Sequence, residues 1–204
     1  MSGEVKAVVF DVGRVLVEWD LRCLYSKLIH DVSELEWFVA NVVTEQWHHQ
    51  HDAGRDLDEM VAERKCAFPG YASLIDAYAT RFLESVPGPV PGTHALVERL
   101  SKCGVPLFAI TNFAAKFWEE FATTEPVLEL FGDIVVSGLE KVAKPDPEIF
   151  DRAAARFGYA PEDMLFIDDS LANIETARSL GWRVHHFVDA DRLAGDLLER
   201  GLLS

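Results

Sequence analysis

Short apolar runs recur along the chain and alternate with segments of helical periodicity. The runs are rich in β-branched and aromatic residues and nearly continuously apolar, as strands covered on both faces of a parallel sheet should be. They predict five strands, at residues 5–10, 105–110, 133–137, 164–168 and 183–188. Helices are predicted between them, at residues 93–102, 147–157 and 171–180, with Asp146 and Ser170 as N-caps. This alternation predicts an α/β fold with a doubly wound parallel sheet.

The pattern changes between residues 17 and 87, where only helical signals are found. A capping box at residues 33–36 predicts a helix that continues through residue 43. Further helices are predicted at residues 21–29, from residue 56 onward and at residues 71–83, and a Pro- and Gly-rich stretch at 87–92 then ends the segment. We therefore predict a Rossmann-like core formed by residues 1–16 and 88–204, with an inserted small all-helical domain at residues 17–87.

Composition narrows the class of protein. Hydrophobic residues make up 49% of the 204 positions, which argues against disorder. The formal net charge of −15 makes nucleic acid and membrane surfaces poor partners, although a few lysines and a metal can still favour an anion inside a cleft. Three widely spaced cysteines without zinc-site spacing favour reduced thiols. No apolar run has the length of a membrane span and the first strand begins almost at once, so we expect a cytoplasmic protein without a signal peptide. The oligomeric state is not indicated.

Polar residues follow several of the predicted strands at their carboxyl ends, where open α/β sheets bind ligands. Asp11 follows the first strand, and Asp168 and Asp169 stand at the end of the fourth. Adjacent carboxylates raise each other's pKa unless a cation lies between them. Three carboxylates around one point, with room for water, suit Mg²⁺.

Two further motifs lie between these acids. Thr111 and Asn112 follow the second strand, and their hydroxyl, amide and nearby backbone N–H groups can bind phosphoryl oxygens or cap the next helix. Lys144 precedes a Pro-Asp-Pro segment that fixes the backbone just before a helix. A lone lysine is usually a solvated surface charge, but its place before this rigid segment favours a functional role.

These motifs, in this order, resemble the four motifs of the haloacid dehalogenase (HAD) superfamily of aspartate-nucleophile hydrolases. The resemblance covers nearly the whole chain. It implies that Asp11 attacks phosphorus to form an aspartyl-phosphate, and that Lys144 neutralises both Asp11 and the transferring phosphoryl group. Thr111, Asn112 and Lys144 would bind the substrate, a small phosphorylated metabolite.

The resemblance also implies a ligand set for Mg²⁺. Asp169 would be a direct ligand, Asp168 a second or water-mediated one, and Asp11 and the main-chain carbonyl of Gly13 would complete the site. A helical insertion between the first and second motifs is similar to the C1 cap of the superfamily, which closes over the nucleophile and supplies specificity. The opening Phe-Asp-hydrophobic-Gly resembles the sugar-phosphate phosphatase branch, the α-D-glucose-1-phosphate phosphatases.

Gly13 departs from the phosphatase pattern, because most HAD phosphatases carry an acid–base aspartate at that position. A 2-haloacid dehalogenase, which needs no such acid, is therefore an alternative, although the Asp168–Asp169 pair argues for a metal-dependent phosphatase. A catalytically degenerate binding protein is a second alternative. In a phosphatase, the leaving oxygen would depart unprotonated or take a proton from water or from a group of the helical insertion. The three histidines of that segment are candidates: His48, His49 and His51.

Overall fold

The computed structural model describes residues 4–203 and contains one five-stranded, fully parallel sheet. The strands stand in the order β3-β2-β1-β4-β5. Their bounds are β1 Ala7–Phe10, β2 Leu107–Thr111, β3 Asp133–Val136, β4 Met164–Asp168 and β5 Arg183–His186. All five predicted strands are therefore present. The chain builds the sheet outward from β1 first on one side and then on the other, which makes the carboxyl end of β1 the switch point where such folds bind ligands.

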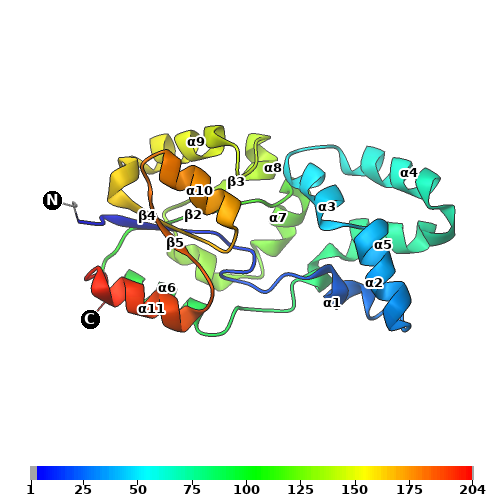
Figure 1. The fold of residues 1–204 in the computed structure, drawn as a ribbon, viewed down its shortest axis with the longest axis horizontal. Coiled ribbons are helices and arrows are strands. Elements are labelled where there is room, and N and C mark those ends of the chain that lie inside the picture. The colour runs from blue at the N-terminus through cyan, green and yellow to red at the C-terminus, as the bar shows by residue number, and fades with distance from the viewer. Residues whose placement is uncertain (1–3, 204) are drawn as a thin grey trace.

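Helices cover both faces of the sheet (Figure 1). Helices α9 (Pro147–Phe157) and α10 (Leu171–Ser179) pack on one face, where Val9, Phe150 and Phe166 belong to one buried cluster. The other face packs against α6 (Thr93–Lys102), α7 (Ala115–Phe121) and α11 (Ala190–Glu199). Short helical segments complete this part: η3 Pro126–Leu130, α8 Ser137–Glu140 and η4 Pro161–Asp163. The predicted doubly wound α/β fold is confirmed.

The remaining helices lie together beyond the carboxyl ends of the strands, on the right of Figure 1. We call this group the helical lobe. Its elements are α1 Leu21–Tyr25, α2 Val32–Asn41, α3 Glu45–Asp52, α4 Leu57–Ala67, η1 Pro69–Tyr71, α5 Ala72–Arg81 and η2 Phe82–Ser85. Its aromatic side chains pack on one another, as Tyr25 and Phe38 do with ring centroids 4.6 Å apart. The lobe shares one continuous hydrophobic cluster with the sheet, so it is packed onto the core.

Two local details differ from the sequence-based expectations. The N-cap of α2 is Asp31, whose carboxylate accepts a hydrogen bond from the Glu34 backbone N–H, so the predicted capping box at Ser33 is wrong. An Asp at N-cap is as good an acceptor as Ser, and it lies two residues earlier. At α10, Ser170 is the N-cap residue, but its side chain makes no capping hydrogen bond. Asp168 accepts from the Ser170 backbone N–H instead.

Helix α3 was not predicted at all. Its sequence, Glu-Gln-Trp-His-His-Gln-His-Asp, has little apolar content and no clear apolar stripe. Thr44 caps it by accepting from the Trp47 backbone N–H, and tertiary packing then buries Trp47, His48, His51 and Asp52. Tertiary packing thus stabilises a helix that the hydrophobic pattern does not indicate.

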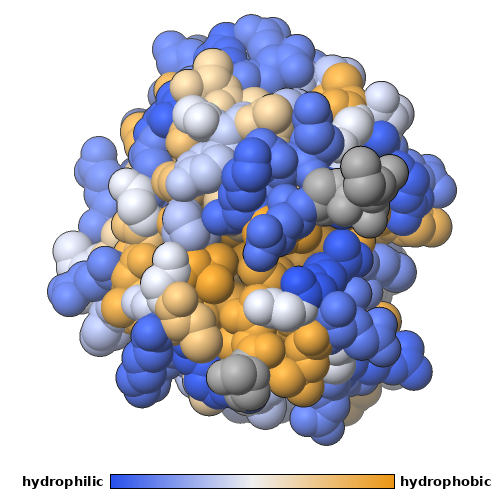
Figure 2. Space-filling model, turned by 90° about the vertical axis from the view of Figure 1, so that its left-hand side faces the viewer, coloured by the Kyte–Doolittle hydropathy of each residue, from blue (hydrophilic) through white to orange (hydrophobic). Residues whose placement is uncertain are grey.

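The end of the molecule opposite the lobe carries an apolar area surrounded by hydrophilic residues (Figure 2). Both ends of the chain lie on this side, away from the carboxyl ends of the strands. No helix within residues 4–203 is long and apolar enough to cross a membrane.

Candidate active site

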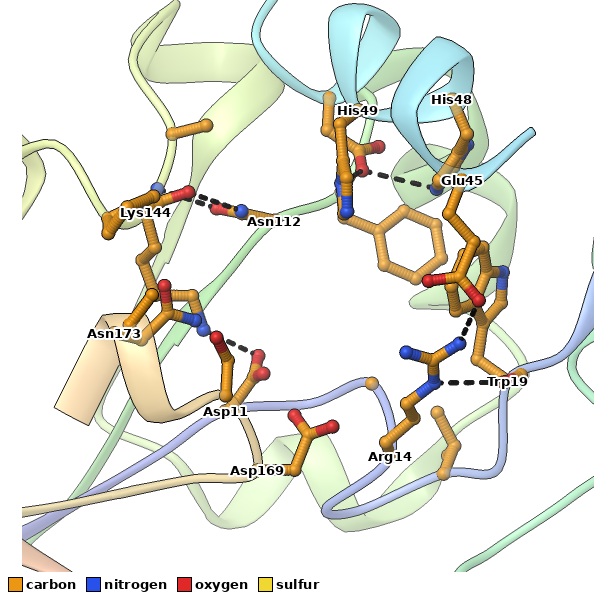
Figure 3. A pocket seen from close by; sticks show the side chains of 18 of the residues that line it. Asp11, Arg14, Trp19, Glu45, His48, His49, Asn112, Lys144, Asp169 and Asn173 are labelled. Atoms are coloured by element: carbon orange, nitrogen blue, oxygen red, sulfur yellow. Dashed lines mark hydrogen bonds and ion pairs between the residues drawn. The ribbon is translucent and has the colours of Figure 1, made fainter. Parts of the chain in front are cut away.

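A cavity of about 520 Å³ lies between the carboxyl ends of the strands and the helical lobe. From the core it is lined by Asp11, Gly13, Asn112, Lys144 and Asp169, and the lobe contributes mainly helix α3. Figure 3 shows the core residues on one side and the α3 residues on the other, with open space between them. The cavity therefore stands where the sheet order predicts a ligand site.

Asp11 comes directly after β1 and is 8% exposed. Its backbone N–H donates to the Ile167 carbonyl at 2.8 Å, which extends the pairing with β4 by one residue. Its Oδ1 accepts from the Val12 backbone N–H at 2.7 Å and lies 2.8 Å from Lys144 Nζ. These contacts all fall on Oδ1, so Oδ2 is the carboxylate oxygen that is available to the cavity.

Lys144 is buried, and its ammonium is held by three acceptors. Nζ lies 2.8 Å from Asp11 Oδ1 and donates at the same distance to Asp168 Oδ2 and the Ile110 carbonyl. Three acceptors satisfy all three donors of an ammonium. Burial alone lowers the pKa of Lys144, but Asp11 and Asp168 outweigh it, so its pKa is raised and the ammonium stays charged. The ammonium is thus fixed in one position against the Asp11 carboxylate.

Asp168 is completely buried and takes part in a dense set of hydrogen bonds. Asn173, from α10, donates Nδ2 to both of its oxygens at 3.0 Å. Oδ1 also accepts from the Ser170 backbone N–H at 2.8 Å, and Oδ2 from Lys144. Its oxygens are therefore occupied, which leaves Asp168 better suited to position Lys144 and to bind an ion through water than to coordinate one directly.

Three carboxylates meet at this end of the sheet. Single oxygens of Asp11, Asp168 and Asp169 all lie within 4.8 Å of one another. Together with the Lys144 ammonium, the group has a formal charge of −2. Burial, with smaller contributions from Asp168 and Asp169, raises the pKa of Asp11 to about 8 despite the opposing effect of Lys144. Burial, and then Asp168, also raise the pKa of Asp169. The donor set and charge fit a divalent cation with a preference for oxygen.

The second-motif residues have different environments. Asn112 exchanges two hydrogen bonds with the Lys144 backbone: Nδ2 donates to the carbonyl at 2.9 Å, and Oδ1 accepts from the N–H at 2.8 Å. Its amide thereby fixes the loop that carries Lys144. Thr111 is 1% exposed, its hydroxyl has no partner among the described residues, and it does not line the cavity. Substrate binding by these two side chains stays a prediction.

Sequence reasoning gave no role to several residues of the site, among them Arg14, Asp52 and Asn173. Arg14 directly follows Gly13 in a tight turn and has a backbone φ of 60°. Its guanidinium lies 4.7 Å from the centre of the Trp19 ring and forms an ion pair with Glu45 of α3. The sequence signals were only positional: Arg14 follows the first motif, and Asn173 lies in the first turn after the fourth. Asp52 stood among candidate histidines without a role of its own.

The comparisons with known proteins agree with this geometry. A model of the haloacid dehalogenase-like hydrolases matches residues 5–181, and the chain belongs to this family. It is 23% identical over 190 residues to the sesquiterpene phosphatase astK of Aspergillus oryzae, covering 93% of each protein. It is also 26% identical to acyl-CoA dehydrogenase family member 10 of Mus musculus, with 92% of this chain covering only 18% of that protein. The prediction of a hydrolytic enzyme of the HAD superfamily is confirmed.

Solved structures show the same fold. A HAD family enzyme from Bacteroides thetaiotaomicron superposes with a TM-score of 0.72 at 21% identity, covering 96% of this chain and 99% of that one. A magnesium complex of that enzyme superposes with a TM-score of 0.68 at 22% identity, with coverage of 92% and 95%. An L-2-haloacid dehalogenase from Xanthobacter autotrophicus gives a TM-score of 0.65 at 15% identity, with coverage of 98% and 85%. At these identities the likeness concerns the fold.

Proposed function

We propose that the protein is a Mg²⁺-dependent phosphatase that hydrolyses a small phosphomonoester, of the sugar-phosphate class, through an aspartyl-phosphate intermediate. One observation carries the proposal: a buried ammonium is fixed against the nucleophile in a carboxylate cluster of formal charge −2. A dehalogenase reaction displaces halide at carbon and has no need for such a cluster. Magnesium in the complex of the Bacteroides enzyme and the name of the Aspergillus phosphatase support the same reading.

In this mechanism Asp11, Asp169 and the Gly13 carbonyl would hold the ion, and Asp168 would act through water. The bound ion would neutralise the carboxylates and the phosphoryl oxygens, which otherwise repel each other. An Asp11 carboxylate oxygen attacks phosphorus, and the bond between phosphorus and the leaving oxygen breaks. Lys144 stabilises the charge that builds up on the phosphoryl group. Water then attacks phosphorus, the bond to Asp11 breaks, and phosphate leaves with the carboxylate regenerated.

Residues 17–87 act as a cap in this proposal. Helix α3 contributes Glu45, His48, His49 and Asp52 to the cavity lining. It is tied to the core by the Ser137 hydroxyl, which donates to the Asp52 carbonyl at 2.6 Å, and by the Arg14–Glu45 ion pair. A cavity of about 520 Å³ suits a small metabolite. The leaving group would therefore contact α3 while the phosphoryl group contacts the core.

The test is a panel of phosphomonoesters, including 4-nitrophenyl phosphate and sugar phosphates, assayed for phosphate release. We expect turnover that disappears with EDTA and returns with excess Mg²⁺, and no turnover in Asp11→Asn. Full phosphatase activity in EDTA would overturn the Mg²⁺ dependence, and release of halide from 2-chloropropionate would favour a dehalogenase. No turnover of any substrate by the folded wild type would favour a binding protein.

A further inference from the structure

The three histidines of α3 are equivalent candidates for the proton donor in the sequence, but the structure gives each a different environment. His48 is 4% exposed and lies between the rings of Trp19 and Phe82, with centroids 4.9 and 5.1 Å away. Both of its ring nitrogens have partners: Nδ1 lies 2.6 Å from the Tyr78 hydroxyl, and Nε2 lies 3.1 Å from Asp52. His48 therefore has no nitrogen free to exchange a proton with a substrate.

His51 belongs to a different cavity, of about 260 Å³, lined also by Arg55 and Lys116. Its Nδ1 donates to the Arg55 carbonyl at 2.9 Å, which leaves Nε2 as the unprotonated nitrogen of the neutral ring. Burial lowers the pKa of His51. Its position in this second cavity separates it from the chemistry at Asp11.

His49 differs from its neighbours in every respect that matters for proton transfer. Its side chain is 55% exposed and lines the main cavity. In Figure 3 its ring projects from α3 into the open space opposite Asp11 and Asp169. Nδ1 lies 3.4 Å from Asp52 Oδ2, so Nε2 is the nitrogen left for a ligand. The ring is therefore anchored at one nitrogen and available at the other.

We propose that His49 is the general acid and base of the reaction, in place of the aspartate that Gly13 replaces, and that Asp52 positions it. The proposal rests on the phosphatase function proposed above. As the bond between phosphorus and the leaving oxygen breaks, Nε2–H gives its proton to that oxygen, and the product alcohol forms. The neutral ring then takes a proton from the water that attacks the aspartyl-phosphate, which returns His49 to its starting state.

The charges around His49 suit this role. Asp52, Glu45 and Arg14 are the charged groups that face it, and His48 lies beside it on α3. The contact with Asp52 is the largest influence and raises the pKa of His49, against burial and the opposing effect of Arg14. The ring thus keeps its proton at a higher pH than a free imidazole would. Asp52 is 1% exposed, so its position is fixed by its surroundings.

The experiment compares wild type and His49→Gln on two substrates with Mg²⁺: 4-nitrophenyl phosphate, whose leaving group needs no proton, and a simple alkyl phosphate. We expect His49→Gln to lose roughly 10²-fold or more of kcat on the alkyl phosphate and little on the aryl one. The matched control, His30→Gln at an exposed position outside the cavity, should change neither. Equal losses on both substrates, or no loss on the alkyl phosphate, would overturn the assignment.

Two further variants test the same step by other readouts. A Cβ at Gly13 would meet no atom within 4 Å, so the backbone leaves room for a side chain to begin there. Gly13→Asp should restore alkyl phosphate hydrolysis in the His49→Gln background, and failure in a folded double variant would count against a missing proton donor.

Asp52→Asn should shift the alkaline limb of the pH profile of kcat to lower pH than in wild type, and an unmoved limb would contradict the positioning role. If wild type hydrolyses neither substrate, the proposed phosphatase function is wrong. If it hydrolyses both, the variants test only the role of His49.

Discussion

Asp11 and Asp52 are two buried aspartates on opposite sides of one cavity, and their pKa values shift in opposite directions. Asp11 shares a single lysine with Asp168, and its pKa is raised to about 8, chiefly by burial. Asp52 is more deeply buried, and burial also raises its pKa, yet the contacts with His48 and His49 reverse this effect and leave its pKa below the usual value. Partners, more than depth of burial, decide the charge of a buried carboxylate.

The difference separates two tasks. The core side of the cavity carries an excess of negative charge that a cation and a phosphoryl group would bring into balance. The α3 side pairs its carboxylate with two imidazoles, and one of them, His49, keeps a ring nitrogen that can exchange a proton. Each prediction below tests one side of this comparison.

The largest effect should come from Asp11→Asn. Without the carboxylate no aspartyl-phosphate can form, so kcat should fall by a factor of roughly 10⁴ or more. The amide has nearly the same shape and removes one of three mutually repelling acids. We therefore expect an unchanged or higher melting temperature in EDTA, measured by circular dichroism. Residual turnover near the wild-type rate would show that Asp11 is not the nucleophile.

Lys144→Ala should come next. It removes a positive charge that lies beside Asp11, where it would stabilise the phosphoryl group, and this should cost roughly 10²–10³ in kcat/KM. It also leaves Asp11 and Asp168 buried without their cation, so the free energy of unfolding in EDTA should drop by about 3–5 kcal/mol. Lys102→Ala is the matched control, because the Lys102 side chain is 76% exposed. Equal behaviour of the two variants in urea titrations and kinetics would show that Lys144 has no more effect on stability or catalysis than an ordinary surface lysine.

Asp169→Asn should weaken Mg²⁺ binding by at least roughly tenfold, since it removes a carboxylate from the proposed ligand set. The Mg²⁺ concentration for half-maximal activity, and calorimetric titration of the metal, would both report the change. Asp151→Asn, at an exposed position on α9, provides the control. An unaltered Mg²⁺ requirement in Asp169→Asn would remove this residue from the ligand set.

Asp11 and Asp52, on the two sides of the cavity, should make the free energy of unfolding depend on pH in opposite ways. Between pH 3.8 and about 8 the metal-free folded state keeps a proton on Asp11 that the unfolded chain has lost. The free energy of unfolding should therefore fall with rising pH across that window, by up to about 1.4 kcal/mol per unit. The lowered pKa of Asp52 acts in reverse: its contribution is present above pH 3.8 and is lost on acidification.

Urea denaturation in EDTA from pH 3 to 8 would measure both trends. Asp11→Asn should flatten the decline towards pH 8, and Asp52→Asn should flatten the loss at the acidic end. A single profile shared by both variants would contradict the opposite shifts.

The smallest effect should come from the Arg14–Glu45 ion pair, which joins the two sides. Its side chains are 40% and 47% exposed, so it should contribute only about 0.2–1 kcal/mol to stability. Arg14→Ala should raise KM by at most about fivefold, the equivalent of 1 kcal/mol. Glu45→Gln keeps the guanidinium in the cavity and should not raise KM. A larger effect of Arg14→Ala would indicate that Arg14 binds the substrate directly.

The sequence predicted the core better than the lobe. Each strand is a short apolar run, and parallel strands place their carboxyl ends together, so the meeting of Asp11 and Asp168 follows from pattern and topology. Helix α3 escaped prediction because its polar sequence shows no apolar stripe. The wrong capping residue of α2 has a similar origin: Asp31 and Ser33 are both good caps, and only the packed helix selects one.

The sequence by itself determined the α/β class, the order of the motifs, and the residue types that meet at the end of the sheet. Only the tertiary structure decided which atoms contact one another. Lys144 is held by three acceptors, and Asn173 donates to both oxygens of Asp168. Of the two histidines that line the cavity, His48 has partners at both ring nitrogens and His49 keeps Nε2 for a ligand. The physical reason is the distance in sequence over which each property is determined. The spacing of hydrophobic residues is a local property of the chain, whereas burial, charge pairing and the availability of a ring nitrogen depend on segments far apart in sequence.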